Sequence, residues 1–392
     1  MSENSREFDR KMMRLALQLA RRGQGRVEPN PLVGAVLCRG RRIVGRGWHG
    51  EFGGPHAEIN AIRMAGGKAR GGTLYVTLEP CCHHGKTGPC TEAILAVAIQ
   101  RVVVAMVDPN PLVCGQGIRR LRNSGVEVCT GVCQVEAQRL NRPFVKWITT
   151  GRPYVILKWA QTIDGCVESR GKSKWISSAA SRSMVHQLRG RVDAVMVGIG
   201  TVRQDDPRLT ARPKKAMDLR RIPRRVILDS YCRLPLTSRL ARSARSIPVC
   251  VFHRRGFGRA AVLRRKRLES YGVQCLAVAP ASEGGLNIRE VLQRLGGMGC
   301  TNLLVEGGPK VLGAFFQARL ADEAWVFIAP QLHGETRGRR AVEGIAPGAG
   351  AGIRGAGIEQ VRRIAEDILV RLRLATGGAR PMDLKGNDII DI

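Results

Sequence analysis

The sequence is poor in aromatic and in acidic side chains, and both shortages limit what it can bind. Aromatic residues make up 4% of the 392-residue chain, while an excess of basic residues gives a formal net charge of +32. Proteins that bind single-stranded nucleic acids interleave basic with aromatic side chains that stack on bases, so we expect no specific nucleic-acid partner. The arginines are spread over the whole chain, which is typical of a proteome-wide bias toward arginine. The positive electrostatic field that they produce would also attract anionic substrates.

The chain also lacks long hydrophobic runs. None approaches the roughly 18 residues needed to cross a bilayer, and the first residues, Met1 to Ser5, lack the pattern of a secretion signal. We therefore expect a cytoplasmic protein with no membrane partner. Its 12 cysteines are scattered, which favours reduced thiols over a disulfide framework. The length suffices for two domains, each with its own core.

A histidine, a glutamate and two cysteines form the strongest chemical pattern. His56 and Glu58 open one segment, and Cys81 and Cys90 come from a second. One imidazole and two thiolates leave the fourth coordination position of zinc open, as in catalytic sites. In such sites the metal lowers the pKa of the water that occupies this position. Glu58 is then placed to move a proton, like the non-ligating glutamate of zinc deaminases. Alone, the His-x-Glu pair would more simply be a helix start beside a solvated carboxylate.

The segment between the two cysteines resembles the deaminase half of the bifunctional RibD family of riboflavin biosynthesis. It reads Glu-Pro-Cys-x-His-His-Gly-Lys-Thr-x-Pro-Cys and places eight residues, rather than two, between the thiols. The runs 30–34 and 108–111 extend the likeness. Cys82 and Gly88 depart from the family pattern, in which serine and proline are common. We assign the metal to Cys81 because it directly follows the Glu-Pro pair.

The first half alternates between helical and strand patterns, which predicts an α/β sheet covered by helices on both faces. Helices are expected over 6–22, from His56 onward, and over 91–98, 117–124 and 135–147. Strands are expected over 33–38, 43–48, 74–78, 102–107 and 126–130. The resemblance implies a cytidine-deaminase-like fold.

Several polar residues around the zinc pattern have two readings. On composition alone they are turn formers or surface side chains. The resemblance instead implies contacts with a phosphorylated pyrimidine by Asn30, His49, Lys86, Asp108 and Asn110. His83 and His84 are interpreted as substrate contacts or as neighbours of the metal ligands.

The second half begins after a short link at 149–153 and resembles the family's reductase domain, whose fold is similar to dihydrofolate reductase. Strands are expected over 153–158, 192–201, 226–228, 249–252, 273–278, from 302 and over 368–374. Helices are expected over 179–189, 259–270 and 310–318. The segments 212–225 and 344–357 are interpreted as loops.

The same resemblance implies an NADPH site and a substrate site in this half. Substrate contacts would be Ser173, Arg189, Leu209, Arg212 and Glu306. Dinucleotide contacts would be Ala160, Trp175, Ser177, Thr201, Asp205, Ser230, Gly308, Pro309, Lys310, Val311, Leu312, Gly313 and Ala314. Without the resemblance, Trp175 would be interpreted as a core residue. The turn Gly307-Gly308-Pro309 would be interpreted as a place where a strand and a helix pack closely.

The sequence therefore predicts a two-step enzyme with a zinc-dependent pyrimidine deaminase domain at 1–150, an NADPH-dependent reductase domain at 151–375 and a polar tail at 376–392. Lys158 and Asp205 are candidates for positioning or protonation in the reduction. We expect a homo-oligomer. Two alternatives remain: a nucleic-acid base deaminase, which would not need NADPH, and a non-catalytic zinc fold, which would close the metal site with a fourth ligand.

Overall fold

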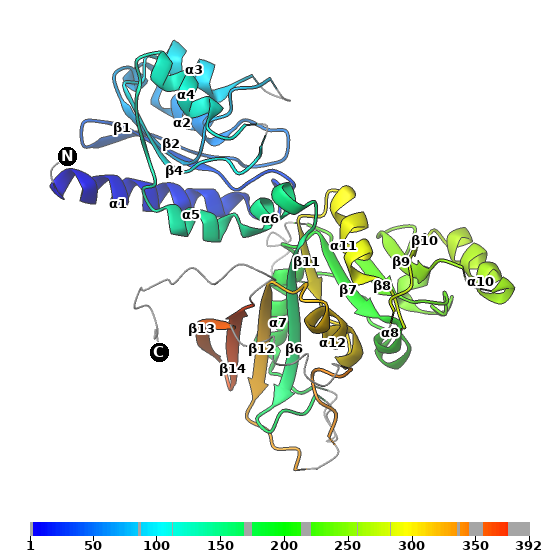
Figure 1. Ribbon diagram of the computed structural model, residues 1–392. Coiled ribbons are helices and arrows are strands. Elements are labelled where there is room, and N and C mark those ends of the chain that lie inside the picture. The colour runs from blue at the N-terminus through cyan, green and yellow to red at the C-terminus, as the bar shows by residue number, and fades with distance from the viewer. Residues whose placement is uncertain are drawn as a thin grey trace. The chain divides into compact units, whose positions relative to one another are not determined.

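The computed structural model describes residues 3–84, 88–111, 113–167, 175–212, 221–256, 258–282, 284–334, 338–344 and 356–374. The chain separates into two compact units, Met1–Arg152 and Pro153–Ile392, which are described one at a time (Figure 1). The expected tail and most of the expected loop at 344–357 lie outside the described residues. None of the described helices is both long and apolar enough to cross a membrane.

The first unit is built on a five-stranded mixed sheet of order β2-β1-β3-β4-β5. Its strands are β1 (Gly34–Arg39), β2 (Arg42–Trp48), β3 (Thr73–Leu78), β4 (Arg101–Met106) and β5 (Glu127–Thr130). β1 is antiparallel to β2 and β3, whereas β3, β4 and β5 run parallel. The carboxyl ends of the three parallel strands therefore share one edge.

Helices cover both faces of this sheet, as the sequence pattern predicts. α2 (Ala57–Ala65), α3 (Cys90–Ala96) and α4 (Gln116–Asn123) pack on one face, and α1 (Glu3–Ala20) and α5 (Gln134–Leu140) pack on the other. Alternate strand residues divide between them: Val102 and Val104 join the first core, Val103 and Ala105 the second. Two short 3₁₀ turns follow α1 and α2, at Arg21–Gly23 and Gly66–Ala69.

The single helix expected over 135–147 is wrong, because the chain breaks at Asn141 into α5 and α6 (Arg142–Thr150). The buried Asn141 side chain accepts from the backbone N–H of Leu32 at 2.8 Å and donates to the carbonyl of Leu32 at 2.9 Å. These two bonds hold the break against the segment that precedes β1.

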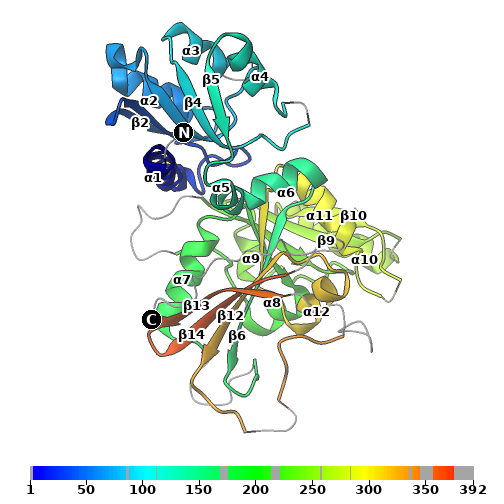
Figure 2. The ribbon, with the colours of Figure 1, turned by 60° about the vertical axis from the view of Figure 1, so that its left-hand side comes forward.

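The second unit contains a nine-stranded sheet of order β10-β9-β8-β7-β11-β6-β12-β14-β13. The seven strands from β10 to β12 are parallel, and β14 and β13 add an antiparallel hairpin beside β12 (Figure 2). Their bounds are β6 (Tyr154–Thr162), β7 (Ala194–Gly198), β8 (Arg224–Leu228), β9 (Val249–Arg254), β10 (Gln274–Val278), β11 (Asn302–Val305), β12 (Glu323–Ala329), β13 (Gly357–Ile364) and β14 (Asp367–Arg373).

Helices again lie on both faces of the sheet. α11 (Ile288–Gly297) and α12 (Pro309–Gln317) supply one core, and α8 (Ile199–Asp205), α9 (Arg239–Arg242) and α10 (Arg259–Ser270) supply the other. α7 (Ala179–Arg189) packs through Val185 on β12, β13 and β14. The strand order brings the carboxyl ends of β7, β11 and β6 together, where α/β folds commonly bind ligands.

Two expectations for this unit are wrong. The strand expected over 192–201 ends at Gly198, and Thr201 lies in the helix α8. The loop expected over 212–225 is wrong at its end, because Arg224 and Arg225 belong to β8 and Arg225 is buried. The Arg225 guanidinium donates to the hydroxyl and the carbonyl of Ser243 and to a further backbone carbonyl, which compensates its burial. Residues 213–220 of that expected loop are outside the described part.

Candidate zinc and reductase sites

The residues of the zinc pattern are held at helix starts by close packing. His56 is the N-cap of α2, and Glu58 lies in the first turn of that helix. α2 sits so close to β2 that a Cβ on Gly47 would lie 2.1 Å from the carbonyl oxygen of Ala57 and one on Gly45 the same distance from that of Ala61. Glycine at these two strand positions therefore lets the helix bring His56 over the sheet edge.

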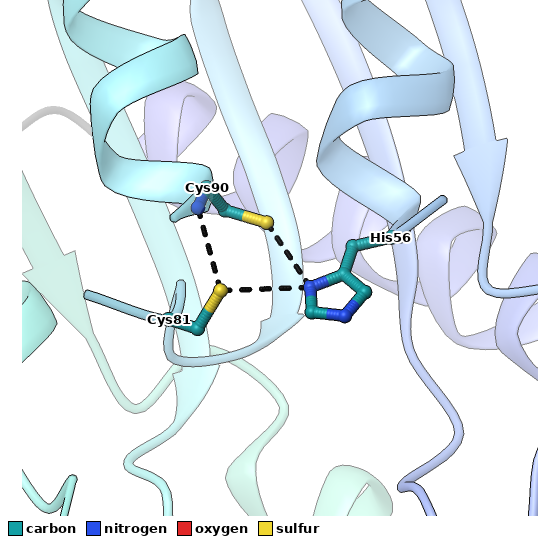
Figure 3. Close-up of side chains that lie close together, drawn as sticks. All are labelled: His56, Cys81 and Cys90. Atoms are coloured by element: carbon teal, nitrogen blue, oxygen red, sulfur yellow. Dashed lines mark hydrogen bonds between the residues drawn. The ribbon is translucent and has the colours of Figure 1, made fainter. Parts of the chain in front are cut away.

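His56, Cys81 and Cys90 converge from three segments (Figure 3). Cys81 follows the end of β3 and Cys90 begins α3. His56 Nδ1 lies 3.2 Å from Cys90 Sγ and 3.5 Å from Cys81 Sγ, and all three ligand atoms fall within 4.8 Å of one another. Bond lengths of about 2.0 Å to nitrogen and 2.3 Å to sulfur fit one zinc ion among them. The donor set is the one expected for a catalytic zinc.

The hydrogen bond between the two thiols shifts their pKa values in opposite directions. The pKa of Cys81 is lowered to about 4, chiefly by its hydrogen bond with the Cys90 thiol and then by His56 and the Cys90 backbone N–H at 3.3 Å. The hydrogen bond with Cys81 raises the pKa of Cys90, and that of His56 is raised for the same reason. A cation in this position would replace these protons, since metal-bound thiols are deprotonated.

Glu58 is buried next to the ligands. Burial raises its pKa to about 7, and its Oε2 atom has no hydrogen-bond partner in the described part of the chain. A carboxyl that changes protonation near neutral pH suits a group that takes a proton and returns it. The sequence predicted this residue for that role.

Four of the predicted pyrimidine contacts are described, and all four line the same cavity as Glu58. This cavity has a volume of about 330 Å³. Its wall includes Asn30 and His49 from one side and Asp108 and Asn110 from the loop after β4. The fifth, Lys86, lies outside the described residues. His83 also lines the cavity.

Glu79 organises the loop that carries Asp108 and Asn110, a role that sequence reasoning missed although the residue belongs to the motif. Its buried carboxylate accepts from the backbone N–H groups of Asp108, Gly115 and Ile118 at 2.9 to 3.2 Å. The segment that bears Cys81 is thus tied to the loop after β4. Glutamate directly before a Pro-Cys pair was the available signal.

The cavity also has an apolar wall that was not predicted. Phe144, Trp147 and Ile148 of α6 line it. Their orientation depends on the helix break at Asn141, which the helical periodicity of this segment does not reveal. The flat rings of Phe144 and Trp147 in this position suit the faces of a heterocycle.

In the second unit, Arg189, Glu306 and Lys158 form one charged cluster. Arg189 Nε and Nη2 donate to the two Glu306 carboxylate oxygens at 2.6 and 2.8 Å. Burial by itself would raise the pKa of Glu306, but Arg189 and then Lys158 hold it below its usual value. The pKa of Lys158 is lowered, first by burial, while Glu306 acts in the opposite direction. Two predicted substrate contacts and one predicted catalytic residue therefore lie together.

The remaining predicted substrate contacts differ in their surroundings. Leu209 is buried and has a left-handed backbone with φ of 53°. Arg212 is exposed, and burial and then Arg189 and other arginines lower its pKa. Ser173 lies outside the described residues.

The predicted dinucleotide contacts come from several strand ends. Gly308 is the N-cap of α12, and a Cβ there would lie 3.4 Å from Thr201 Oγ1, so these two contacts are adjacent. Asp205 is the exposed last residue of α8, and Ser230 follows β8 and is half-buried. Glycine at a helix start leaves room for an anionic group near free backbone amides.

The other predicted dinucleotide contacts show mixed exposure. Trp175 is 54% exposed, with the Arg182 guanidinium 4.8 Å from its ring, and the Ser177 carbonyl accepts from Arg182. Ala160 lies in β6. Within α12, Pro309, Val311 and Ala314 are partly buried, Lys310 is exposed, Leu312 is in the core and Gly313 packs on the backbone of Glu343.

Two family models match the chain, one for each unit. The cytidine and deoxycytidylate deaminase zinc-binding region matches residues 6–106, and the RibD C-terminal domain matches residues 153–370. The fold and the site thus define a deaminase with a zinc-binding region joined to a reductase. The expected fold class, a cytidine-deaminase-like domain followed by a dihydrofolate-reductase-like one, is confirmed.

Relatives match both units together. Riboflavin biosynthesis protein RibD from Aquifex aeolicus is 45% identical over 331 residues, which are 84% of this chain and 89% of that protein. The structure of Acinetobacter baumannii RibD aligns with a TM-score of 0.82 and 36% identity, over 95% of this chain and all of the other. A Thermotoga maritima diaminohydroxyphosphoribosylaminopyrimidine deaminase/5-amino-6-(5-phosphoribosylamino)uracil reductase aligns with a TM-score of 0.80 and 36% identity, over 95% of this chain and 100% of that one. The chain belongs to the RibD family of bifunctional deaminase–reductases in riboflavin biosynthesis.

Proposed function

We propose that the first unit removes ammonia from a diaminohydroxyphosphoribosylaminopyrimidine and that the second reduces the ribosyl group of the resulting 5-amino-6-(5-phosphoribosylamino)uracil to ribityl with NADPH. The Thermotoga maritima relative is named as a deaminase of the first compound and a reductase of the second. The observation that carries the proposal is the convergence of His56, Cys81 and Cys90 beside the buried carboxyl of Glu58, at a cavity that His56, Glu58 and Cys81 line.

In the first reaction, His56, Cys81 and Cys90 would hold the zinc ion. When bound, zinc lowers the pKa of water and so supplies a nucleophile at neutral pH. Glu58 would take a proton from the attacking water and deliver it to the leaving amino nitrogen, and the burial that raises the pKa of its carboxyl suits both transfers. Asn30 and His49 orient the ring, and Lys86 is expected to meet the substrate phosphate.

In the second reaction, NADPH supplies the hydride to the ribosyl carbon C1′. Lys158 and Asp205 remain our candidates for positioning or protonation, and Lys158 is supported by its place beside Glu306 and Arg189. Asp205 is supported by its position on α8, the helix that also carries Thr201 beside Gly308. We further propose that the protein is a homo-oligomer.

The decisive variant for the first unit is Glu58→Gln. We expect it to keep one zinc per chain, because Glu58 is not a ligand, and to lose ammonia release by roughly 10²–10⁴-fold, the usual contribution of a general acid–base group. Persistent ammonia release by zinc-loaded Glu58→Gln protein would show that another group moves the proton.

The two halves are separated by following ammonia and nicotinamide oxidation in the same incubation. With the aminopyrimidine phosphate and no NADPH, we expect ammonia only. Addition of NADPH should then give its oxidation in proportion to the uracil formed. Ammonia release that never leads to NADPH oxidation would restrict the proposal to the first unit, and a nucleic-acid base deaminase would show no NADPH binding at all.

A further inference from the structure

The second unit contains a cavity that is lined by none of the residues predicted for its substrate or dinucleotide site. It has a volume of about 440 Å³ and lies between α8, the segment after β8 and α10. Cys232 and four apolar residues form part of its wall, namely Leu234, Pro235, Leu236 and Leu268. The size is within the range of small-molecule sites.

The rest of the wall is arginine: Arg203, Arg233, Arg264 and Arg267. Four of nine lining residues are therefore cationic, whereas lysine and arginine together are 64 of the 392 residues of the chain. The described wall contains no carboxylate. The cavity wall is therefore richer in cations than the chain as a whole, and guanidinium groups gathered around a hollow repel one another unless an anion joins them.

Two of these arginines have bonds that fix them in place. Arg264 Nε donates to the Tyr231 carbonyl at 3.1 Å, so the α10 side chain is tied to the segment after β8. Arg233 lies over the Tyr231 ring at 5.5 Å and only 3.8 Å from Asp229. These contacts place the two guanidinium groups in the wall before any ligand arrives, which lowers the entropic cost of binding.

The other two are unpaired. Neither the Arg203 nor the Arg267 guanidinium has a hydrogen-bond or ion-pair partner within the described ranges. Guanidinium groups match phosphate oxygens with two parallel hydrogen bonds. We propose that this cavity is a binding site for the phosphate group of a small organic phosphate, whose carbon framework rests on the leucines and the proline.

Such a phosphate has two sources. It is either the 2′-phosphate of the dinucleotide, which is proposed to bind along the neighbouring residues Thr201 and Ser230, or the phosphate of a separate metabolite. The chemistry recognised is the same in both cases. The cavity itself does not depend on the reductase assignment, because its binding can be measured without turnover.

The test measures binding of inorganic pyrophosphate to the full-length protein by calorimetry. The variant is Arg203→Gln with Arg267→Gln, since these unpaired side chains can change without breaking a contact of the fold. The matched control is Arg259→Gln with Arg289→Gln, two exposed arginines on α10 and α11 that do not line the cavity. Both pairs remove the same charge.

We expect the cavity variant to weaken binding by about tenfold for each arginine, the loss typical of a charge-assisted hydrogen bond, and the control to change it less than about threefold, the effect of general charge alone. Equal binding by the two variants would overturn the proposal. Arg203→Lys with Arg267→Lys keeps the charge and should recover only part of the affinity, because an ammonium lacks the planar fork.

The source is then decided by repeating the titration with saturating NADPH. Two results together would identify the ligand as the 2′-phosphate of the dinucleotide. Saturating NADPH would abolish pyrophosphate binding, and the cavity variant would raise KM for NADPH but not for NADH. Undiminished binding assigns a separate phosphate ligand. Failure of the reductase assay in the wild-type protein would contradict the proposed function but would leave the pyrophosphate result standing.

Discussion

The side-chain amide of Asn30 is oriented by the imidazole of His49. Asn30 Nδ2 lies 3.2 Å from His49 Nε2, and His49 Nδ1 lies 3.2 Å from the carbonyl oxygen of Pro55. A carbonyl only accepts, so Nδ1 carries the proton and Nε2 accepts from Asn30. Burial, which lowers the pKa of His49, favours this neutral form. The amide oxygen of Asn30 then remains an acceptor, and we propose that an N–H of the pyrimidine donates to it.

Replacement of His49 by phenylalanine keeps a ring in place but removes both hydrogen bonds, so the Asn30 amide can rotate. We expect kcat/KM for deamination to fall by about 10- to 100-fold, the effect of about two lost hydrogen bonds, mostly through KM, with the zinc content unchanged. Steady-state kinetics and metal analysis of the same preparation check this. An unchanged KM would mean that His49 does not set the orientation of Asn30.

The two neighbouring thiols, Cys81 and Cys82, are expected to differ completely in metal binding. Cys81 Sγ faces His56, whereas Cys82 Sγ lies 3.9 Å from the side-chain oxygen of Gln116. Cys81→Ser should lose most of its zinc and its deaminase activity, since an alcohol is a far weaker ligand than a thiolate. Cys82→Ser should retain both. Metal analysis after gel filtration decides between them, and zinc loss from Cys82→Ser would reverse our assignment.

Gly47 is expected to control the position of α2 and hence of His56. A Cβ there would lie 2.1 Å from the Ala57 carbonyl oxygen, so Gly47→Ala must push the helix outward. Overpacking of this kind costs about 1–3 kcal/mol of stability, and the zinc affinity should fall as well. Gly67→Ala is the matched control, because a Cβ at Gly67 meets nothing within 4 Å. Urea unfolding and zinc titration of both proteins give the comparison, and equal behaviour would contradict the prediction.

The zinc residues could be predicted because the chemistry of a metal site restricts residue type and spacing together. His56, Glu58, Cys81 and Cys90 lie at strand ends and helix starts. Because such positions meet at one edge of the sheet, residues that are separate in the sequence come together in the fold. The alternation of strands and helices could also be predicted, because runs of apolar residues indicate buried strands. Val102 to Ala105 is such a run, and all four residues are buried in the structure.

Other features could not be read from the sequence because they depend on distant partners. Asn141 breaks a helix only through its bonds to Leu32, 109 positions away. Arg225 is buried only because backbone carbonyls from the segment that follows α9 surround its guanidinium. Trp147 lines the deaminase cavity as a consequence of the break at Asn141. Local pattern says nothing about these contacts.

The carboxylate of Glu306 is expected to stabilise the second unit in a pH-dependent way. Its side chain is 9% exposed and is bonded to Arg189, whose side chain is 13% exposed. Glu306→Gln leaves the cations of Arg189 and Lys158 without their shared counter-charge, and breaking a buried pair costs about 3–5 kcal/mol. Glu127→Gln is the control, since Glu127 pairs with Arg101 at the surface with 65% exposure, where a pair contributes about 0–1 kcal/mol.

The sign of the pH effect follows from the lowered pKa of Glu306 in the folded protein. Its stabilising contribution is fully present above the ordinary glutamate pKa of 4.5 and is lost as the pH falls through the lowered folded value. The free energy of unfolding of Glu306→Gln should therefore differ most from the wild type near neutral pH, and the difference should close on acidification because both side chains are then neutral. Urea titrations across this range measure it. A difference that stays constant with pH would assign the loss to packing rather than to charge.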